Sequence, residues 1–364
     1  MKTGWQTKPF EDCVAKVVHT RKIHRKDFLR DGRFPIVSQE DQFINGYWDD
    51  EADLFRVTTP VVVFGDHTRV LKFVDFDFAL GADGVKVLQP RDFLLPKFFF
   101  YQLQAANLGS QGYARHYRLL KELEIAYPAR PEQLRIIGIL DEAFEDIASA
   151  KARAEKNLQN ARAILESHLH AIFGRRGTGW VETTVDRLSA NLDSRRIPVA
   201  KDKRTKGAYP YYGASGIVDY VADYIFDGDA LLVSEDGANL LMRSTPIAFS
   251  VSGRYWVNNH AHILKFENMA TQRFVEFYLA SIRLDEYVTG AAQPKLTQKA
   301  LNAIPIPIPP SVDAQAGVVE ELDALERTAQ DLDSIYRRKL AALEELKKSL
   351  LNEAFSGRLT KNAA

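Results

Sequence analysis

Ile304-Pro305-Ile306-Pro307-Ile308-Pro309-Pro310 stands immediately before a proline-free stretch that runs from Asp313 to Phe355. Each proline fixes φ, lacks an N–H and pushes the residue before it toward extended geometry, so the run cannot be helical. In the following stretch apolar residues recur at steps of three and four, the pattern of a coiled-coil seam. We therefore predict an extended segment, which is followed by a long helix. The seam positions are Val318, Leu322, Leu325, Ala329, Leu332, Tyr336, Leu343, Leu346 and Leu350.

The same change of character occurs once earlier in the chain. Ile125-Ala126-Tyr127-Pro128-Ala129-Arg130-Pro131 precedes a proline-free stretch from Glu132 to Phe173. Helices of about 40 residues span roughly 60 Å, and neither could bury its stripe against a small domain alone. We expect the two helices to pack antiparallel as a rod; the alternative is that each dimerises with another chain. The earlier seam consists of Leu140, Phe144, Ile147, Ala154, Leu158, Ala161, Leu165 and Ile172.

An internal repeat covers nearly the whole chain. Gly4-Trp5 matches Gly179-Trp180, and Phe34-Pro35 matches Tyr209-Pro210 at the same offset. The part before each helix is rich in Val, Phe, Tyr and Gly in short runs, which predicts mixed β structure with some helix. The predicted fold class is α+β: two similar mixed α/β domains separated by two long antiparallel coiled-coil helices, with a pseudo-twofold repeat. The predicted segments are 1–131 (domain 1), 132–174 (helix 1), 175–310 (domain 2) and 311–364 (helix 2).

Composition restricts the class of protein. The 364 residues carry 48 Lys and Arg against 48 Asp and Glu, which argues against a purely electrostatic nucleic-acid binder. No apolar run is long enough to span a bilayer, and the N-terminus has no apolar signal region. The single Cys13 excludes an internal disulfide and a cysteine-rich zinc site. We expect a cytoplasmic protein.

Ordered motifs occur in both copies: Tyr209–Gly216, Leu232–Asn239, Val257–His262, Gln293–Leu296 and Leu350–Leu359 in the second, and Phe64–Arg69 and Gly81–Leu88 in the first. They resemble the motifs of the specificity (S) subunits of type I restriction-modification systems. The first copy departs from the pattern, because it has no counterpart of Tyr209–Gly216 beyond Phe34–Ser38, and Tyr113–Tyr117 stands where the second copy has Gln293–Leu296. The two halves should therefore read different DNA half-sites.

The resemblance implies that each globular part is a target recognition domain for one half of a split double-stranded DNA sequence. It also implies two methyltransferase subunits as partners, which methylate adenine N6, and an ATP-driven restriction subunit. The rod of two helices would hold the two recognition domains apart and would also bind the methyltransferase subunits. The chain itself has no Asn/Asp-Pro-Pro-aromatic motif, no phosphate-binding loop and no convincing nuclease cluster. We expect a non-catalytic subunit that binds no cofactor, because S-adenosylmethionine, ATP and Mg²⁺ would belong to its partners.

Candidate DNA contacts are polar residues in or beside loops of the two copies. Arg commonly reads guanine and Lys commonly meets phosphate, although a solvated charge or an ordinary ion pair explains any one of them equally well. Asn in glycine-rich loops more often caps turns, and Tyr beside a turn is often buried. His260 and His262 lack a third ligand nearby in sequence, so no metal is predicted. The candidates are His67, Thr68, Arg69, Lys72, Arg115, Arg118, Lys203, Arg204, Lys206, Tyr211, Tyr212, Ser215, Asn239, Arg243, Asn259, His260, Gln293 and Lys295.

The helices supply the candidate residues for binding a partner. Two other classes of protein remain as alternatives: a coiled-coil scaffold whose end domains bind protein, and a nuclease or methyltransferase with a degenerate site. The DNA reader should lose affinity steeply as salt rises, whereas the scaffold should bind its partner independently of salt. The enzyme alternative is tested by whether the purified chain alone modifies DNA. The partner-binding candidates are Leu140, Phe144, Leu158, Leu165, Leu322, Leu332, Leu343 and Leu346.

Overall fold

The computed structural model describes residues 4–18, 20–106, 108–109, 112, 114–175, 177, 179–290 and 293–356. The chain divides into two compact units, Met1–Glu155 with Arg338–Ala364, and Lys156–Arg337. Each unit contains one globular domain and parts of two long helices, α4 (Arg130–Arg175) and α9 (Val312–Ser356). Tyr113 and the residues 357–359 of two sequence motifs lie outside the described residues.

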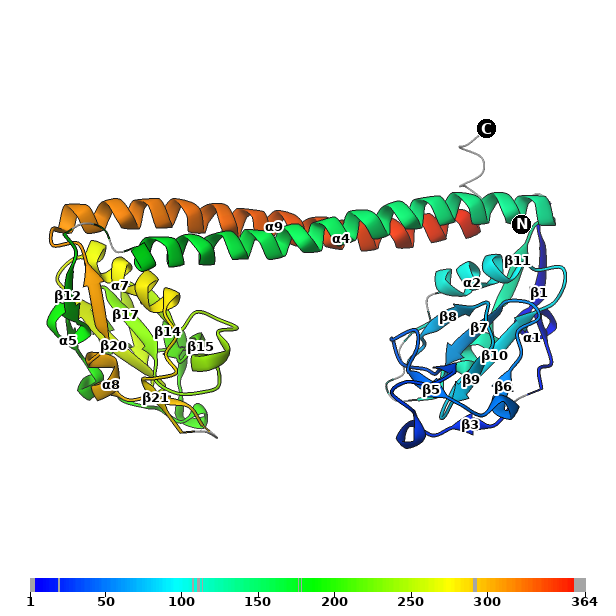
Figure 1. The fold of residues 1–364 in the computed structure, drawn as a ribbon, viewed down its shortest axis with the longest axis horizontal. Coiled ribbons are helices and arrows are strands. Elements are labelled where there is room, and N and C mark those ends of the chain that lie inside the picture. The colour runs from blue at the N-terminus through cyan, green and yellow to red at the C-terminus, as the bar shows by residue number, and fades with distance from the viewer. Residues whose placement is uncertain are drawn as a thin grey trace. The chain divides into compact units, whose positions relative to one another are not determined.

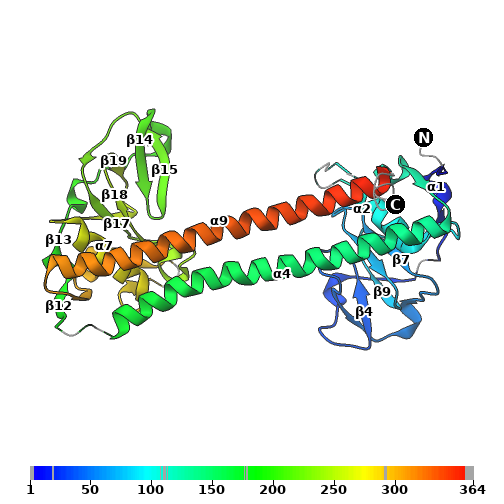
Figure 2. The same ribbon diagram turned by 90° about the horizontal axis from the view of Figure 1, so that it is seen from above.

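Within each unit the segments of α4 and α9 lie side by side and antiparallel (Figures 1 and 2). In the first unit the ammonium of Lys151 lies 2.6 Å from the Glu344 carboxylate, and in the second Arg162 lies 2.9 Å from Asp333. Rising numbers on α4 thus meet falling numbers on α9. The predicted packing of the two helices is confirmed. The predicted seam residues Leu140, Ala154, Ala161 and Leu322 are buried. Leu169 of α4 and Leu351 and Ala354 of α9, outside the predicted seam, are buried as well.

The second domain is built on a four-stranded antiparallel sheet covered by α7 (Met269–Ser281). The sheet has the order β13 (Ser189–Asn191), β20 (Ala261–Phe266), β17 (Ala230–Ser234), β18 (Ala248–Val251). Phe274 of α7 packs edge-on against Phe173 of α4 at 5.3 Å, and Arg273 pairs with Asp323 of α9. Helix α7 therefore lies between the sheet and the helix pair (Figure 1).

A second sheet of the same domain shares an apolar cluster with the main sheet, in which its Phe226, Tyr255 and Val257 join Leu232 and Ile263. Its edge strand β15 leaves three large apolar side chains, Ile217, Val218 and Tyr220, about half exposed. This sheet has the order β15 (Gly216–Val221), β14 (Lys206–Gly213), β19 (Arg254–Val257), β16 (Phe226–Asp227).

The first domain repeats this arrangement. Helix α2 (Pro96–Ala105) covers the main sheet, and its Phe98 contacts Phe355 of α9 while its Tyr101 contacts Phe144 of α4. The main sheet has the order β2 (Val14–Ala15), β10 (Val85–Pro90), β7 (Val61–Gly65), β8 (Leu71–Val74). The second sheet has the order β3 (Lys22–Ile23), β9 (Phe78–Gly81), β4 (Phe34–Val37), β5 (Gly46–Trp48), with β6 (Leu54–Phe55) also paired to β9.

Strand register gives the residue correspondence between the two copies. Gly65 pairs with Val85 as Ser234 pairs with Ala261. The residue after each central strand then makes the same bond: Asp66 N–H to Gly84 O at 2.7 Å, and Glu235 N–H to His260 O at 2.9 Å. The registers therefore make Asp66 of the first copy equivalent to Glu235 of the second.

The Ile-Pro run forms an edge strand, β23 (Pro305–Ile308), which pairs antiparallel with β12 (Val181–Thr184). Proline suits an edge strand because its missing N–H need not face a neighbour. In the first domain β11 (Glu124–Tyr127) pairs in the same way with β1 (Gln6–Pro9). Each domain thus begins and ends on one two-stranded ribbon beside the helices. Among the described residues, no helix has the length and apolar character needed to cross a membrane.

Candidate nucleic-acid interface

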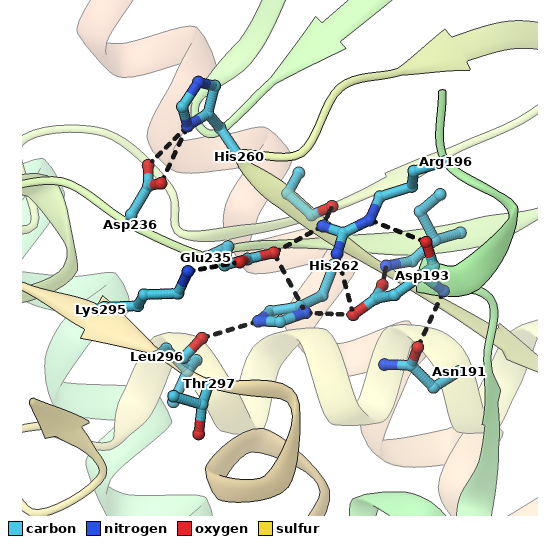
Figure 3. Close-up of polar contacts among 12 residues, drawn as sticks. Asn191, Asp193, Arg196, Glu235, Asp236, His260, His262, Lys295, Leu296 and Thr297 are labelled. Atoms are coloured by element: carbon cyan, nitrogen blue, oxygen red, sulfur yellow. Dashed lines mark hydrogen bonds and ion pairs between the residues drawn. The ribbon is translucent and has the colours of Figure 1, made fainter. Parts of the chain in front are cut away.

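Three polar side chains from separate segments meet where β17 ends, and we call them the rim: Asp236, His260 and Lys295 (Figure 3). His260 Nδ1 lies 2.9 Å from both carboxylate oxygens of Asp236. The backbones of Asp236 and Lys295 form an antiparallel bridge, and Lys295 begins β22 (Lys295–Leu296). The side chains of His260 and Lys295 are about half exposed, so the rim presents two basic groups to solvent.

A buried ionic cluster adjoins the rim and consists of Asp193, Arg196, Glu235 and His262 (Figure 3). His262 Nδ1 lies 2.5 Å from Asp193 Oδ2, and the Arg196 guanidinium donates to Glu235 Oε2 at 2.6 Å. Asp193 also accepts from the Ile263 N–H at 2.9 Å. Lys295 joins the cluster to the rim, since its ammonium lies 3.1 Å from Glu235 Oε1.

Opposing effects act on the two buried carboxyl groups. Burial by itself would raise the pKa of Asp193, but the hydrogen bond and the charge of His262 hold that pKa below its usual value. Burial acts in the same direction on Glu235, whose pKa is also held low by its bonds to Arg196 and Lys295. Both carboxylates are therefore ionised at neutral pH.

The cluster does not fit a metal ion, although Asp193, Glu235 and His262 place their ligand atoms within 4.8 Å of one another. Nδ1 of His262 faces Asp193, and Nε2 lies 2.8 Å from the Leu296 carbonyl oxygen. A ring nitrogen that donates a hydrogen bond has no lone pair to offer a metal. Both carboxylates already pair with Arg196, and Glu235 pairs with Lys295 as well.

The basic residues Lys203, Arg204 and Lys206, at and just before the start of β14, have two different roles. Lys203 and Lys206 are exposed. The Arg204 guanidinium instead lies 4.3 Å from the ring centre of Tyr211 and 3.3 Å from the Asp219 carboxylate. Arg204 thus fastens the β14–β15 ribbon, and the two lysines are left facing solvent.

The aromatic candidates pack inside the domain. Tyr211 is buried, and its hydroxyl accepts from the Val199 N–H at 3.0 Å. Tyr212 packs against Phe249 and Tyr255. Ser215, in contrast, is exposed at the turn between β14 and β15.

Asn239 and Arg243 stabilise the loop after β17. The Asn239 side chain accepts from the Thr245 N–H and donates to the Thr245 carbonyl, both at 3.0 Å. Arg243 adopts a left-handed backbone with φ of 52°, and its guanidinium donates to the carbonyls of Leu279 and Ile282. Asn259 and Gln293 are exposed next to the rim.

The corresponding edge of domain 1 is organised around one loop. Thr68 donates to the Gln39 carbonyl at 2.5 Å, and the His67 N–H donates to the Gln39 side chain. Lys72 is buried and donates to the Gln42 carbonyl and, at 3.0 Å, to Asn45.

Burial lowers the pKa of Lys72 to about 8. The arginines of domain 1 among the candidates lie at its surface instead: Arg115 and Arg118 are exposed on either side of buried His116. Arg69 is exposed, adopts φ of 64° and donates to the Leu108 carbonyl at 2.9 Å. The structure does not bring the domain 1 candidates together in one cluster.

The helix candidates differ in burial. Leu140 and Leu322 are fully buried in the cores of their domains, whereas Leu346 is 47% exposed. The half-buried candidates are Phe144, Leu158, Leu165, Leu332 and Leu343.

Sequence reasoning missed the partners that hold the rim. Asp193, Arg196 and Glu235 were not named as site residues, and His262 was considered only as one of two alternating histidines without a third ligand nearby in sequence. The signal in the sequence was weak: Asn191 and Asp193 stand two residues apart before Arg196, which is typical of a loop with side-chain caps. The exposed apolar residues of β15 were also missed, because their pattern in the sequence is the same as that of apolar residues in a buried strand.

Comparison with known proteins identifies the class. Residues 180–341 match the family model described as the type I restriction modification DNA specificity domain. A Haemophilus influenzae protein named as a type I restriction enzyme specificity subunit is 37% identical over 141 residues, or 39% of this chain. The Escherichia coli EcoprrI specificity subunit is 23% identical over 141 residues. These alignments span 36% and 34% of the relatives' own lengths.

Solved structures share the fold of the whole chain. A chain from work on assembly and conformational transition of the type I R-M system aligns over 98% of both chains, with a TM-score of 0.73 and 15% identity. The HsdS subunit from Thermoanaerobacter tengcongensis aligns over 98% of this chain and 97% of its own, with a TM-score of 0.54 and 16% identity. The second domain, with the adjoining part of α9, thus matches a DNA specificity domain, and the whole chain has the fold of the solved type I structures. Residues 180–341 carry the specificity domain of type I restriction-modification systems, the family that the sequence motifs resemble.

Proposed function

We propose that the chain reads a bipartite target in double-stranded DNA, with one domain on each half of the target. The observation that carries this proposal is that both domains have the same backbone arrangement where the central strand of the main sheet ends, but different side chains there. Where domain 2 has His260 and Lys295, the backbone correspondence gives Gly84 and Arg115 in domain 1. Base edges are read by such side chains, so two copies that differ there should prefer different half-sites.

The helix pair is the proposed dock for two methyltransferase subunits, with restriction subunits as further partners. Three apolar residues of α4 and α9, Ile164, Ile335 and Leu346, are 46–48% exposed. Exposed apolar positions on long helices fit binding to another protein. In this proposal S-adenosylmethionine, ATP and Mg²⁺ are bound by the partners, and 1–131 and 175–310 are the two recognition domains.

The test is to co-express the chain with the methyltransferase subunit encoded beside it and to map N6-methyladenine across the host DNA. A split motif with a fixed gap, absent when the chain is omitted, is the expected result. Co-purification without any methylated motif would instead favour a protein-binding scaffold, the alternative function.

Replacing Lys203 and Lys206 together with Ala should weaken DNA binding and make it less sensitive to salt. Each phosphate contact contributes about −0.9 to the slope of log K against log salt, so the loss of two contacts should make the slope shallower by roughly 1.8. The measurement is fluorescence anisotropy with a labelled duplex over a salt series.

Lys265 provides the matched control, because it is exposed at the other end of β20 from His260. Lys265→Ala should leave the slope unchanged. If the double variant keeps the wild-type slope, Lys203 and Lys206 do not touch DNA.

A further inference from the structure

His262 has an oxygen acceptor on each side of its ring. Nδ1 lies 2.5 Å from the Asp193 carboxylate, and Nε2 lies 2.8 Å from the Leu296 carbonyl oxygen (Figure 3). An ionised carboxylate and a carbonyl only accept, and a neutral imidazole donates from one nitrogen alone. Both bonds are therefore made when His262 is an imidazolium.

With this charge the buried cluster is neutral without Lys295. Two carboxylates, Asp193 and Glu235, face one guanidinium and one imidazolium, and His262 Nδ1 lies 3.8 Å from Glu235 Oε2. Arg196 bonds to that same oxygen at 2.6 Å. Lys295 contacts only the other oxygen, Oε1, among the ion pairs of the described residues, and its side chain is 51% exposed. A partly exposed ion pair of this kind is weak and can exchange partners.

Domain 1 has cations at both equivalent positions. The strand registers place Lys86 where domain 2 has His262. The bond from the His116 N–H to Asp66 O matches the bond from the Leu296 N–H to Glu235 O, which places exposed Arg115 at the position of Lys295. Each copy thus has one cation on the strand, His262 or Lys86, and one solvent-facing cation near it, Lys295 or Arg115.

We propose that His262 is a positioning residue for Lys295: its imidazolium, with Arg196, neutralises the buried carboxylates, and the Lys295 ammonium leaves Glu235 to bind a DNA phosphate. The proposal rests on the proposed function and adds to it one specific contact and the buried group that makes it available. Phosphate is the expected ligand because the flexible ammonium of Lys is suited to it.

Without the positive charge of His262, Glu235 has one neutralising partner fewer, so its carboxylate should hold the Lys295 ammonium more tightly.

The experiment measures the slope of log K for DNA binding against log salt. It uses the full chain, co-expressed with its methyltransferase subunit, and a duplex that carries the mapped target. Lys295→Met should make the slope shallower by about 0.9. His262→Gln should make it shallower by the same amount, and Lys295→Met should then cause no further loss. Adding Glu235→Gln to His262→Gln should restore the slope, because it frees Lys295 again.

A merely structural role of His262 would give a different pattern. His262→Gln would then lower affinity without the loss of one phosphate contact, and Glu235→Gln would not restore it; either result overturns the proposal. Thermal unfolding of each variant reports whether it folds. If His262→Gln does not fold, Glu235→Gln decides alone: Lys295→Met must still make its slope shallower by about 0.9, and no change overturns the proposal. A wild-type complex with no preference for the target over a scrambled duplex refutes the proposed function itself, a result distinct from all of these.

Discussion

Replacing Leu140 with Asp is expected to lower the thermal unfolding midpoint of the first unit by roughly 10 °C. Leu140 is fully buried in a cluster that joins domain 1 to the end of α9, including Leu351 and Ala354. The substitution removes buried apolar surface and places a carboxyl group without a partner there, which costs about 3–5 kcal/mol. For a unit of this size, 1 kcal/mol corresponds to about 2–4 °C. Differential scanning calorimetry would measure the midpoint.

Leu346→Asp is the matched control for this prediction. Leu346 lies on α9 but is 47% exposed, so the same substitution should leave the midpoint nearly unchanged. On the proposed function it should instead weaken co-purification with the methyltransferase subunit. Equal destabilisation by both substitutions would contradict the described seam.

The second large effect is expected for Arg196→Met. The guanidinium bonds to the Glu235 carboxylate and to the Ala261 and Asp193 carbonyls, and its side chain is 14% exposed. Removing one partner of a buried ion pair costs about 3–5 kcal/mol, because the other charge is left uncompensated. Chemical denaturation should report this loss for the second unit. Arg195→Met, which removes the exposed neighbouring cation, should cost much less.

The same cluster gives a pH dependence. The pKa values of Asp193 and Glu235 are lower in the folded protein than their ordinary values of 3.8 and 4.5. The stability that these groups contribute is therefore present in full above pH 4.5 and is lost as pH falls through the lower folded values. Arg196→Met should lose less further stability on acidification, since part of that contribution is already gone. An equal acid loss in both proteins would show that the cluster does not cause it.

The sequence predicted the features that depend on local pattern. The two long helices follow from three-four spacing, and the extended geometry of Ile304–Pro310 follows from proline chemistry. Pairing of that run with Val181–Thr184 was not predicted, because its partner lies more than a hundred residues away. Nothing local in a strand indicates which distant strand it meets.

Site residues were harder to predict for the same reason. Side-chain type alone does not separate a solvent-facing cation such as Lys203 from one that fastens its own domain, as Arg204, Arg243 and Lys72 do. The buried cluster unites residues from 193 to 262 through tertiary contacts, so no spacing rule could reveal it.

The two-stranded ribbons that open and close each domain have a consequence for inheritance. Val181 lies opposite Ile308, and Gln6 lies opposite Tyr127, so the entry and exit of each domain are neighbours. A contiguous gene segment that encodes one domain can then be exchanged for a homologous segment with both junctions at one place beside the helices. On the proposed function, recombination between related genes would replace the domain that reads one half of the target and leave the other domain and the long helices as they were.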